Sequence, residues 1–297
     1  MANSQKPSNK QFSKIHIEIS NICNLQCSFC PEVLRGKKLI STSDFRNILK
    51  EVAPLTEQVA FHLMGDPLVH PHLEELVQIC GEEGVRIFLV TNGVLLREKQ
   101  LEILLHSAFR QVNFSLHSFP DNFPERDVEP YLEKIFHYTE LALAQRPDLY
   151  INYRLWNLAD PRGKNPKNTE ILNAIESRFG ISVPQNLDVR LQKSFKLQGR
   201  LYLHWDTEFT WPAMHLPVLG NKGRCLGLKS HFGILVDGTV VPCCLDKEGD
   251  IRLGNIHEST VVEILNSQRA KAMVKGFQNR KLVEPLCQRC QYIERFG

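Results

Sequence analysis

Short segments in which hydrophobic and polar residues alternate recur along the chain, and longer amphipathic segments separate them. Residues 15–19 read Ile-His-Ile-Glu-Ile, a period of two that predicts a short strand. From Thr42 onward the apolar residues recur every three or four positions, which predicts an amphipathic helix. The chain therefore opens with a strand, a connecting loop and a helix.

The same unit repeats through the first two thirds of the sequence. Six such units in a row predict an α/β protein with a mostly parallel sheet covered by helices. We expect a partial (β/α)6 barrel of the TIM type rather than an open doubly wound sheet. The further strands are predicted over 59–64, 86–90, 111–116, 150–156 and 187–192, and the further helices around 73–80, 101–105, 132–136 and 171–179.

The periodicity is lost after about residue 193. Residues 233–244 then read as a β-hairpin closed by Asp237 and Gly238, a pair typical of a two-residue turn of the primed type. The remaining chain is too small for a large core, so we expect a group other than apolar burial to stabilise it. The predicted organisation is a polar tail (1–14), a barrel (15–198), a bridging segment (199–224) and a small cysteine-rich domain (225–297).

Composition and charge exclude several classes of protein. With 297 residues and 42% hydrophobic side chains, the chain can bury one large core, or one core plus a small domain. The formal charge of +3 is mild, and no Lys/Arg block is dense enough to indicate nucleic-acid binding. No segment has the roughly 18–20 apolar residues of a membrane span or the apolar stretch of a signal peptide. We expect a cytoplasmic protein with no membrane partner.

Nine cysteines in a reducing compartment favour metal ligation or catalysis over disulfides. Cys23, Cys27 and Cys30 lie on the loop that leaves the first predicted strand, at the functional face of a barrel. Three thiolates can hold three irons of a 4Fe-4S cluster and leave the fourth iron open, whereas structural zinc takes four ligands. This spacing therefore favours an iron-sulfur cluster over zinc.

The segment CNLQCSFC (23–30) resembles the CxxxCxxC signature of the radical S-adenosylmethionine (SAM) superfamily. Two further segments are similar to family landmarks: LMGDPLVHP (63–71) to its GGEPLL-type segment and TNG (91–93) to the end of its third strand. The resemblance implies a 4Fe-4S cluster whose open iron binds SAM. It also implies reductive cleavage of SAM to methionine and a 5'-deoxyadenosyl radical, which abstracts hydrogen from a substrate carbon.

The resemblance also implies contacts with SAM. Phe29 is expected to pack on the adenine, and the backbone at Gly65 and Asp66 to meet the amino group. Ser115 and Arg154 fall where family members often hold the ribose and the carboxylate. The chain has Met64 and Asp66 where the family often has glycine and glutamate, so a contact from the carboxylate of Asp66 is left open. His117 is a further candidate contact, with a structural role as the alternative.

A second set of cysteines resembles the SPASM motif, a C-terminal iron-sulfur domain of radical SAM peptide maturases. Only seven residues follow Cys290, so we expect the shortened "twitch" form with one auxiliary 4Fe-4S cluster. A four-cysteine zinc ribbon is the alternative. Cys244 is a spare or alternative ligand, and Cys80 is expected in the core. The expected ligands of the auxiliary cluster are Cys225, Cys243, Cys287 and Cys290.

Three functions follow from these patterns. The first is a radical SAM oxidoreductase that oxidises a small molecule, with the auxiliary cluster as electron acceptor. The second is a peptide or protein maturase; only 22 residues precede Cys23, so its leader-binding domain would be a separate partner. The third is a non-enzymatic iron-sulfur or zinc scaffold. The expected partners are SAM, a small-molecule or peptide substrate, and a reductant such as flavodoxin or ferredoxin.

Overall fold

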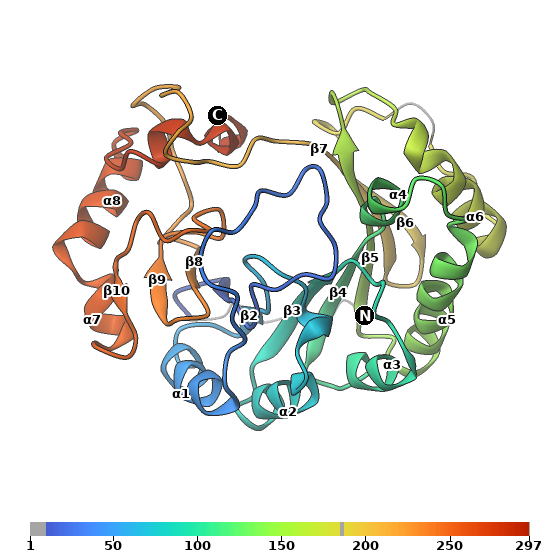
Figure 1. Cartoon of the computed structure of the whole chain (residues 1–297), viewed down its shortest axis with the longest axis horizontal. Helices are drawn as coiled ribbons and strands as arrows, with labels where there is room; N and C mark the ends of the chain where they lie inside the picture. Colours follow the sequence, from blue (N-terminus) through green and yellow to red (C-terminus); the bar gives the residue numbers. More distant parts are fainter. Residues whose placement is uncertain (1–9, 185–186, 297) are drawn as a thin grey trace, which may run out of the picture.

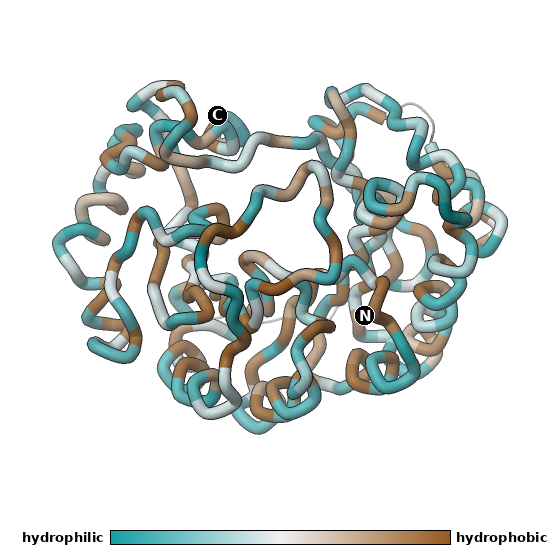
Figure 2. Tube along the Cα trace, in the orientation of Figure 1, coloured by the Kyte–Doolittle hydropathy of each residue, from teal (hydrophilic) through white to brown (hydrophobic). Residues whose placement is uncertain are grey.

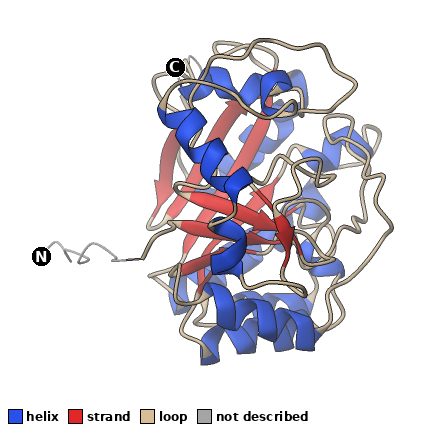
Figure 3. Ribbon diagram, turned by 90° about the vertical axis from the view of Figure 1, so that its left-hand side faces the viewer, coloured by secondary structure: helices blue, strands red, loops and turns tan. Residues whose placement is uncertain are grey.

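The computed structural model describes residues 10–184 and 187–296, which fold around one ten-stranded sheet. The strand order is β10-β9-β8-β1-β2-β3-β4-β5-β7-β6. The seven strands from β8 to β7 pair in parallel, and the outer pairs at both edges are antiparallel. Helices cover the outer side of this curved sheet (Figures 1 and 3). The predicted partial barrel with a small C-terminal domain is confirmed.

The strands are two to nine residues long. They are β1 (Lys14–Ile17), β2 (Gln58–Ala60), β3 (Arg86–Thr91), β4 (Phe109–Ser115), β5 (Tyr150–Leu158), β6 (Ser194–Gln198), β7 (Leu201–Thr207), β8 (His231–Ile234), β9 (Thr239–Val241) and β10 (Gly254–Asn255).

The α-helices are α1 (Thr42–Val52), α2 (Leu73–Glu82), α3 (Glu98–Leu104), α4 (Ser118–Asn122), α5 (Glu129–Gln145), α6 (Thr169–Phe179), α7 (Val261–Leu265) and α8 (Gln268–Gln278). Four 3-10 helices complete the fold: η1 (Pro67–Val69), η2 (Pro166–Asn168), η3 (Cys287–Arg289) and η4 (Gln291–Phe296). Figure 2 shows the helices alternating between hydrophilic and hydrophobic residues, as expected for helices with one buried face. None of the helices in the described residues has the length and apolar character of a membrane span.

The strand predicted over 187–192 is wrong. Asp188 begins a turn there instead. Its carboxylate accepts a hydrogen bond from the backbone N–H of Arg190 at 3.0 Å, and its backbone carbonyl accepts one from the backbone N–H of Gln192 at 3.0 Å. The strand that pairs with β5 is β7 instead, within the segment predicted as a bridge. The barrel sheet thus continues past residue 198, where the predicted barrel ends.

The C-terminal hairpin is present, but its predicted turn type is wrong. Gly238 has a φ of 85°, whereas Asp237 is not among the described residues with positive φ, so the turn is not of type I′. The turn runs from Leu235 to Gly238, whose N–H donates to the Leu235 carbonyl at 2.9 Å. Asp237 instead accepts from the N–H of Thr239 at 3.0 Å, which holds this longer turn. Strand β8 then pairs in parallel with β1, so the hairpin lies beside the strand that leads to the first cysteines.

The two faces of the barrel strands differ in chemistry. On β5 the outward residues Ile151, Tyr153 and Leu155 are fully buried beneath the helices. The inward residues Asn152 and Arg154 are only half-buried. The hydrophobic core thus lies between sheet and helices, and the inner face of the sheet is left for polar side chains.

Candidate functional site

The first three cysteines lie on the long loop between β1 and α1, which crosses the centre of the molecule in Figure 1. The backbone N–H of Cys30 donates to the Cys27 carbonyl at 3.1 Å, which closes a tight turn between these two residues. A hydrogen bond from the Cys30 thiol lowers the pKa of Cys27 to about 7. Cys23 and Cys30 are exposed, so the loop presents thiols toward the open side of the sheet.

Amide groups from other parts of the chain donate to these sulfur atoms. Asn122 Nδ2 lies 3.1 Å from Cys27 Sγ, and Asn92 Nδ2 lies 3.7 Å from Cys23 Sγ. The backbone N–H of Leu25 also donates to Cys23 Sγ at 3.4 Å. Such N–H···S bonds stabilise thiolates and tune the potential of a bound cluster. The donor set therefore fits a three-cysteine iron-sulfur site.

Helix α4 anchors the cysteine loop from the other side of the barrel mouth. The Asp121 carboxylate accepts from the Ser28 N–H at 2.7 Å and from its hydroxyl at 2.8 Å. Asn122 Oδ1 accepts from the N–H of Gln26 at 2.9 Å. Neither Asp121 nor Asn122 was predicted from the sequence. Their signal is the pair of short polar side chains in HSFPDN (117–122), six and seven residues after the end of β4.

Gly65 allows the segment after β2 to pack against the cysteine loop. Its φ is 74°, and an added Cβ would lie 2.5 Å from the Ser20 carbonyl oxygen and 2.7 Å from that of Ile22. The next residue, Asp66, donates its N–H to the Ile22 carbonyl at 2.9 Å. Only glycine can occupy this position without moving the loop.

The carboxylate of Asp66 joins the segment after β2 to the end of β3. It is 3% exposed and accepts from the N–H of Leu68 at 2.9 Å and of Asn92 at 2.7 Å. The Thr91 hydroxyl lies 2.9 Å from the same carboxylate. Burial raises the pKa of Asp66, while these hydrogen bonds lower it. The carboxylate is therefore engaged with the chain itself.

Of the other predicted SAM contacts, Ser115 ends β4 and Arg154 lies in the middle of β5. Ser115 and Arg154 are direct register partners on these adjacent parallel strands. The Phe29 ring packs against His117, with 4.7 Å between the ring centroids. His117 Nδ1 donates to the Arg154 carbonyl at 2.9 Å, and burial lowers the pKa of His117 to about 4. His117 is thus a neutral group that positions its neighbours.

The second cysteine set gathers in the C-terminal domain. Cys225, Cys287 and Cys244 each raise the pKa of Cys243, although burial is the main cause. Cys290 raises the pKa of Cys244 as well. The five thiols therefore form one group whose members influence each other electrostatically. Cys80 lies apart on α2 and is fully buried, as predicted.

The two cysteine-bearing parts contact each other directly. Lys247 Nζ donates to the Glu32 carbonyl at 2.7 Å, and the N–H of Leu34 donates to Glu248 Oε1 at 3.1 Å. Arg35, which pairs with the buried Glu18 at 2.8 Å, also donates from Nε to the Lys247 carbonyl at 2.7 Å. The loop after the C-terminal hairpin therefore supports the loop that carries the first three cysteines.

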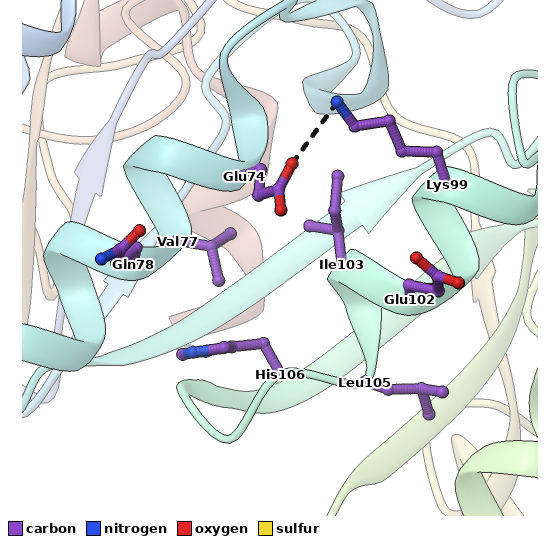
Figure 4. Close-up of a pocket in the computed structure, with 8 residues that line it drawn as sticks. All are labelled: Glu74, Val77, Gln78, Lys99, Glu102, Ile103, Leu105 and His106. Carbon is purple, nitrogen blue, oxygen red and sulfur yellow. Dashed lines mark ion pairs between the residues drawn. The ribbon is translucent and has the colours of Figure 1, made fainter.

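Within the described ranges, no three His, Cys, Asp or Glu side chains are grouped as ligands of a single metal ion. Ligands of a cluster bind different irons, so their sulfur atoms lie further apart than those around one ion. A surface pocket lies elsewhere, between α2 and α3 (Figure 4). Two of its three charged residues, Glu74 and Lys99, pair with each other at 3.4 Å, and none of its lining residues belongs to either cysteine set. It is therefore distinct from the cysteine site.

Family models match both parts of the chain. The model of the radical SAM superfamily matches residues 17–147. The SPASM model, described as an iron-sulfur cluster-binding domain, matches residues 225–291. The first match contains Cys23, Cys27 and Cys30, and the second contains the four predicted auxiliary ligands.

Curated proteins are similar in sequence to this chain over parts of its length. A SAM-dependent 2-deoxy-scyllo-inosamine dehydrogenase of Niallia circulans is 27% identical over 37% of this chain and 46% of its own length. A PqqA peptide cyclase of Rhodopseudomonas palustris is 30% identical over 33% of this chain and 27% of its own length. A GTP 3',8-cyclase of Synechocystis is 26% identical over 81% of both chains. The chain thus spans less than half the length of the first two of these relatives.

Solved structures share the fold. BtrN in complex with AdoMet and 2-DOIA has a TM-score of 0.57 and 16% identity over 96% of this chain and 94% of its own. SuiB of Streptococcus suis bound to its precursor peptide SuiA has a TM-score of 0.62 and 14% identity over 96% and 73%. The family implies SAM and a 4Fe-4S cluster as cofactors, and the SPASM domain implies auxiliary iron-sulfur binding. The chain therefore carries a domain of the radical SAM superfamily over residues 17–147 and a C-terminal SPASM iron-sulfur domain over residues 225–291.

Proposed function

We propose that this enzyme reductively cleaves SAM to methionine and a 5'-deoxyadenosyl radical, which abstracts a hydrogen atom from a substrate carbon. The observation that carries this proposal is the loop of Cys23, Cys27 and Cys30, with amide donors aimed at Cys23 and Cys27. These three residues would hold the SAM-binding 4Fe-4S cluster, which when bound supplies the electron for cleavage. A flavodoxin or ferredoxin is the proposed source of that electron.

The residues around this loop are proposed to orient SAM. Phe29 would pack on the adenine, and Ser115 and Arg154 would bind the ribose and the carboxylate from neighbouring strands. The backbone at Gly65 and Asp66 would meet the amino group, since the Asp66 carboxylate already accepts from Thr91 and Asn92. Fixed positions of this kind favour a single cleavage geometry.

We further propose that the net reaction is an oxidation. After losing a hydrogen atom to 5'-deoxyadenosyl, the substrate radical must lose one more electron and a proton to give a closed-shell product two electrons more oxidised. The auxiliary cluster on Cys225, Cys243, Cys287 and Cys290 is the proposed acceptor of that electron. In support, Arg154 lies within electrostatic reach of both Cys30 and Cys244, so the two cysteine sets border one space.

Anaerobic assays with the reconstituted enzyme test this function. Reduced protein should form methionine and 5'-deoxyadenosine slowly without substrate, and the Cys30→Ala variant should form neither. With a deuterated substrate, deuterium should appear in 5'-deoxyadenosine, with one SAM consumed per product. Regeneration of SAM in each turnover would indicate an isomerisation and would contradict the oxidation.

Peptide maturation is the second candidate function. The fold of SuiB, which was solved with its precursor peptide, matches 96% of this chain, and PqqA peptide cyclases are among the sequence relatives. The two functions differ in the kind of substrate, which is a peptide in maturation and a small molecule in the oxidation. Faster 5'-deoxyadenosine formation with a peptide fraction, abolished by protease treatment of that fraction, would favour maturation. Stimulation by the protease-resistant small-molecule fraction would favour the oxidoreductase.

A further inference from the structure

The inner face of the barrel sheet carries three hydrogen-bond donor groups that lack a counterpart. Lys14 Nζ lies 3.3 Å from the centre of the Phe88 ring and forms no ion pair with an acid of the described residues. Arg154 stacks on Trp156 at 3.4 Å, and its buried Nε has no hydrogen-bond partner. The buried Nδ1 of His62 likewise has none. Buried polar atoms without partners are rare and call for an explanation.

These three groups converge from different elements. Lys14 begins β1, His62 follows β2, and Arg154 lies on β5. His62 is within electrostatic reach of both Lys14 and Arg154, and Lys14 of Arg154. All three residues keep part of their surface exposed, although Arg154 Nε and His62 Nδ1 are themselves buried.

Lys14 and Arg154 form no ion pair with a carboxylate of the described residues, although thiols lie within electrostatic reach of both. Asp206 lies near Arg154, but its carboxylate is taken by Lys193 at 2.9 Å and by Arg295 at 2.6 Å. Burial lowers the pKa of Lys14 to about 8, while the nearby Cys244 thiol raises it and Arg154 lowers it further. His16 faces the same space, but its Nδ1 already lies 3.1 Å from the His62 carbonyl and is committed to it.

We propose that Lys14, His62 and Arg154 form a binding site for an anionic group of the substrate, a carboxylate or a phosphate. The substrate of this enzyme would then be an organic acid, a phosphate ester or an acidic peptide. Two cations and an adaptable imidazole supply the charge and the several donors that such oxygens accept from. A substrate whose charge is a protonated amine would be repelled by the same groups.

This inference rests on the proposed function only in assigning the anion to the substrate. The carboxylate of SAM is the other source of a matching anion, and Arg154 is its proposed partner above. Lys14 on β1 and His62 after β2 are not among the proposed SAM contacts, so substitutions of these two residues test a second anion separately from SAM. Binding measurements need no turnover, so their failure is distinct from a failure of SAM cleavage.

Calorimetric titration of the oxidised, reconstituted enzyme with inorganic phosphate tests the site. Lys14→Met should weaken phosphate binding at least tenfold, and Lys14→Arg should restore most of it. Lys50→Met, the same change on the exposed end of α1, should leave phosphate binding unchanged. SAM affinity of Lys14→Met should stay within about twofold of the parent, with iron content unchanged.

Three outcomes would overturn the proposal. Phosphate binding that is equally strong in Lys14→Met and in the parent would remove Lys14 from any anion site. An equal loss of SAM and phosphate affinity would assign the anion to SAM itself. If Lys14→Met does not fold, the parent enzyme tests the proposal instead. Phosphate must then bind to the parent when SAM is already present. Displacement of SAM by phosphate, or of phosphate by SAM, would refute a separate substrate site.

Discussion

The side-chain amide of Asn122 donates a hydrogen bond to Sγ of Cys27 at 3.1 Å, although 95 residues separate them in the chain. The same side chain accepts from the backbone of the cysteine loop through Gln26 at 2.9 Å. Asn122 thus positions the loop and polarises one of its sulfur atoms. Helix α4 is in this way part of the cluster site.

Replacing Asn122 by leucine should lower the reduction potential of the three-cysteine cluster. An N–H···S bond favours the reduced, more negative cluster, and its loss at about 1 kcal/mol corresponds to about 40 mV for one electron. Spectroscopic redox titration measures the shift. Asn279→Leu, the same change at the exposed end of α8, should leave the potential unchanged; an equal shift in both would exclude this role.

The Asp66→Asn variant should be less stable than the parent. The Asn92 N–H and the Leu68 N–H both donate to this buried carboxylate, and an amide can accept from only one side. One unsatisfied buried donor costs about 1–3 kcal/mol in the free energy of unfolding. Chemical denaturation would measure it, with Asp250→Asn at an exposed position as control. Unchanged stability would show that water replaces these bonds.

Phe29→Ala should weaken SAM binding without loss of the cluster. Aromatic stacking contributes about 1 kcal/mol beyond area burial, so the Kd for SAM should rise roughly fivefold or more. Calorimetry measures the affinity and iron analysis the cluster content. A variant that loses its iron instead would show that the ring, which packs on His117, holds the loop rather than the adenine.

His16 should make the protein sensitive to mild acid. Burial lowers the pKa of His16 to about 3, below the ordinary 6.5. Because the folded state resists protonation, the stability from neutral His16 is complete above pH 6.5 and is lost as the pH falls toward 3. At pH 5.5 the loss amounts to about 1.4 kcal/mol.

The His16→Asn variant should therefore lose about 1.4 kcal/mol less unfolding free energy between pH 7.5 and pH 5.5 than the parent. Asparagine keeps a donor for the His62 carbonyl, which His16 contacts at 3.1 Å. Denaturation curves at both pH values give the difference. His137→Asn on the exposed face of α5 serves as the control; equal pH dependence in all three proteins would contradict the prediction.

The Cys287→Ala/Cys290→Ala variant should separate SAM cleavage from oxidation. Reconstituted parent should contain about eight irons and the variant about four, because two clusters are served by three and four thiolates. The variant should still form 5'-deoxyadenosine but little oxidised product. Simultaneous loss of both activities, together with a lower melting temperature, would instead indicate that the cluster only stabilises the domain.

Much of the architecture followed from sequence periodicity. The first five strands of the barrel lie in or beside the segments predicted for them, because each outer face must be apolar to pack beneath a helix. The error at 187–192 arose where local hydrogen bonds of Asp188 form a turn. Alternation over Leu201–Thr207 was present, but only pairing with β5 made it the next parallel strand.

The sequence by itself determined the spacing of Cys23, Cys27 and Cys30, a local property of one loop, and this spacing predicts an iron-sulfur cluster. Only the tertiary structure decided which other groups meet them. Asn122 reaches Cys27 because α4 follows the fourth parallel strand, whose carboxyl end shares the edge that the cysteine loop crosses. Lys14, His62 and Arg154 face one space because β1, β2 and β5 curve around it. Such convergence depends on the register and curvature of the whole sheet, which no short segment of the chain encodes.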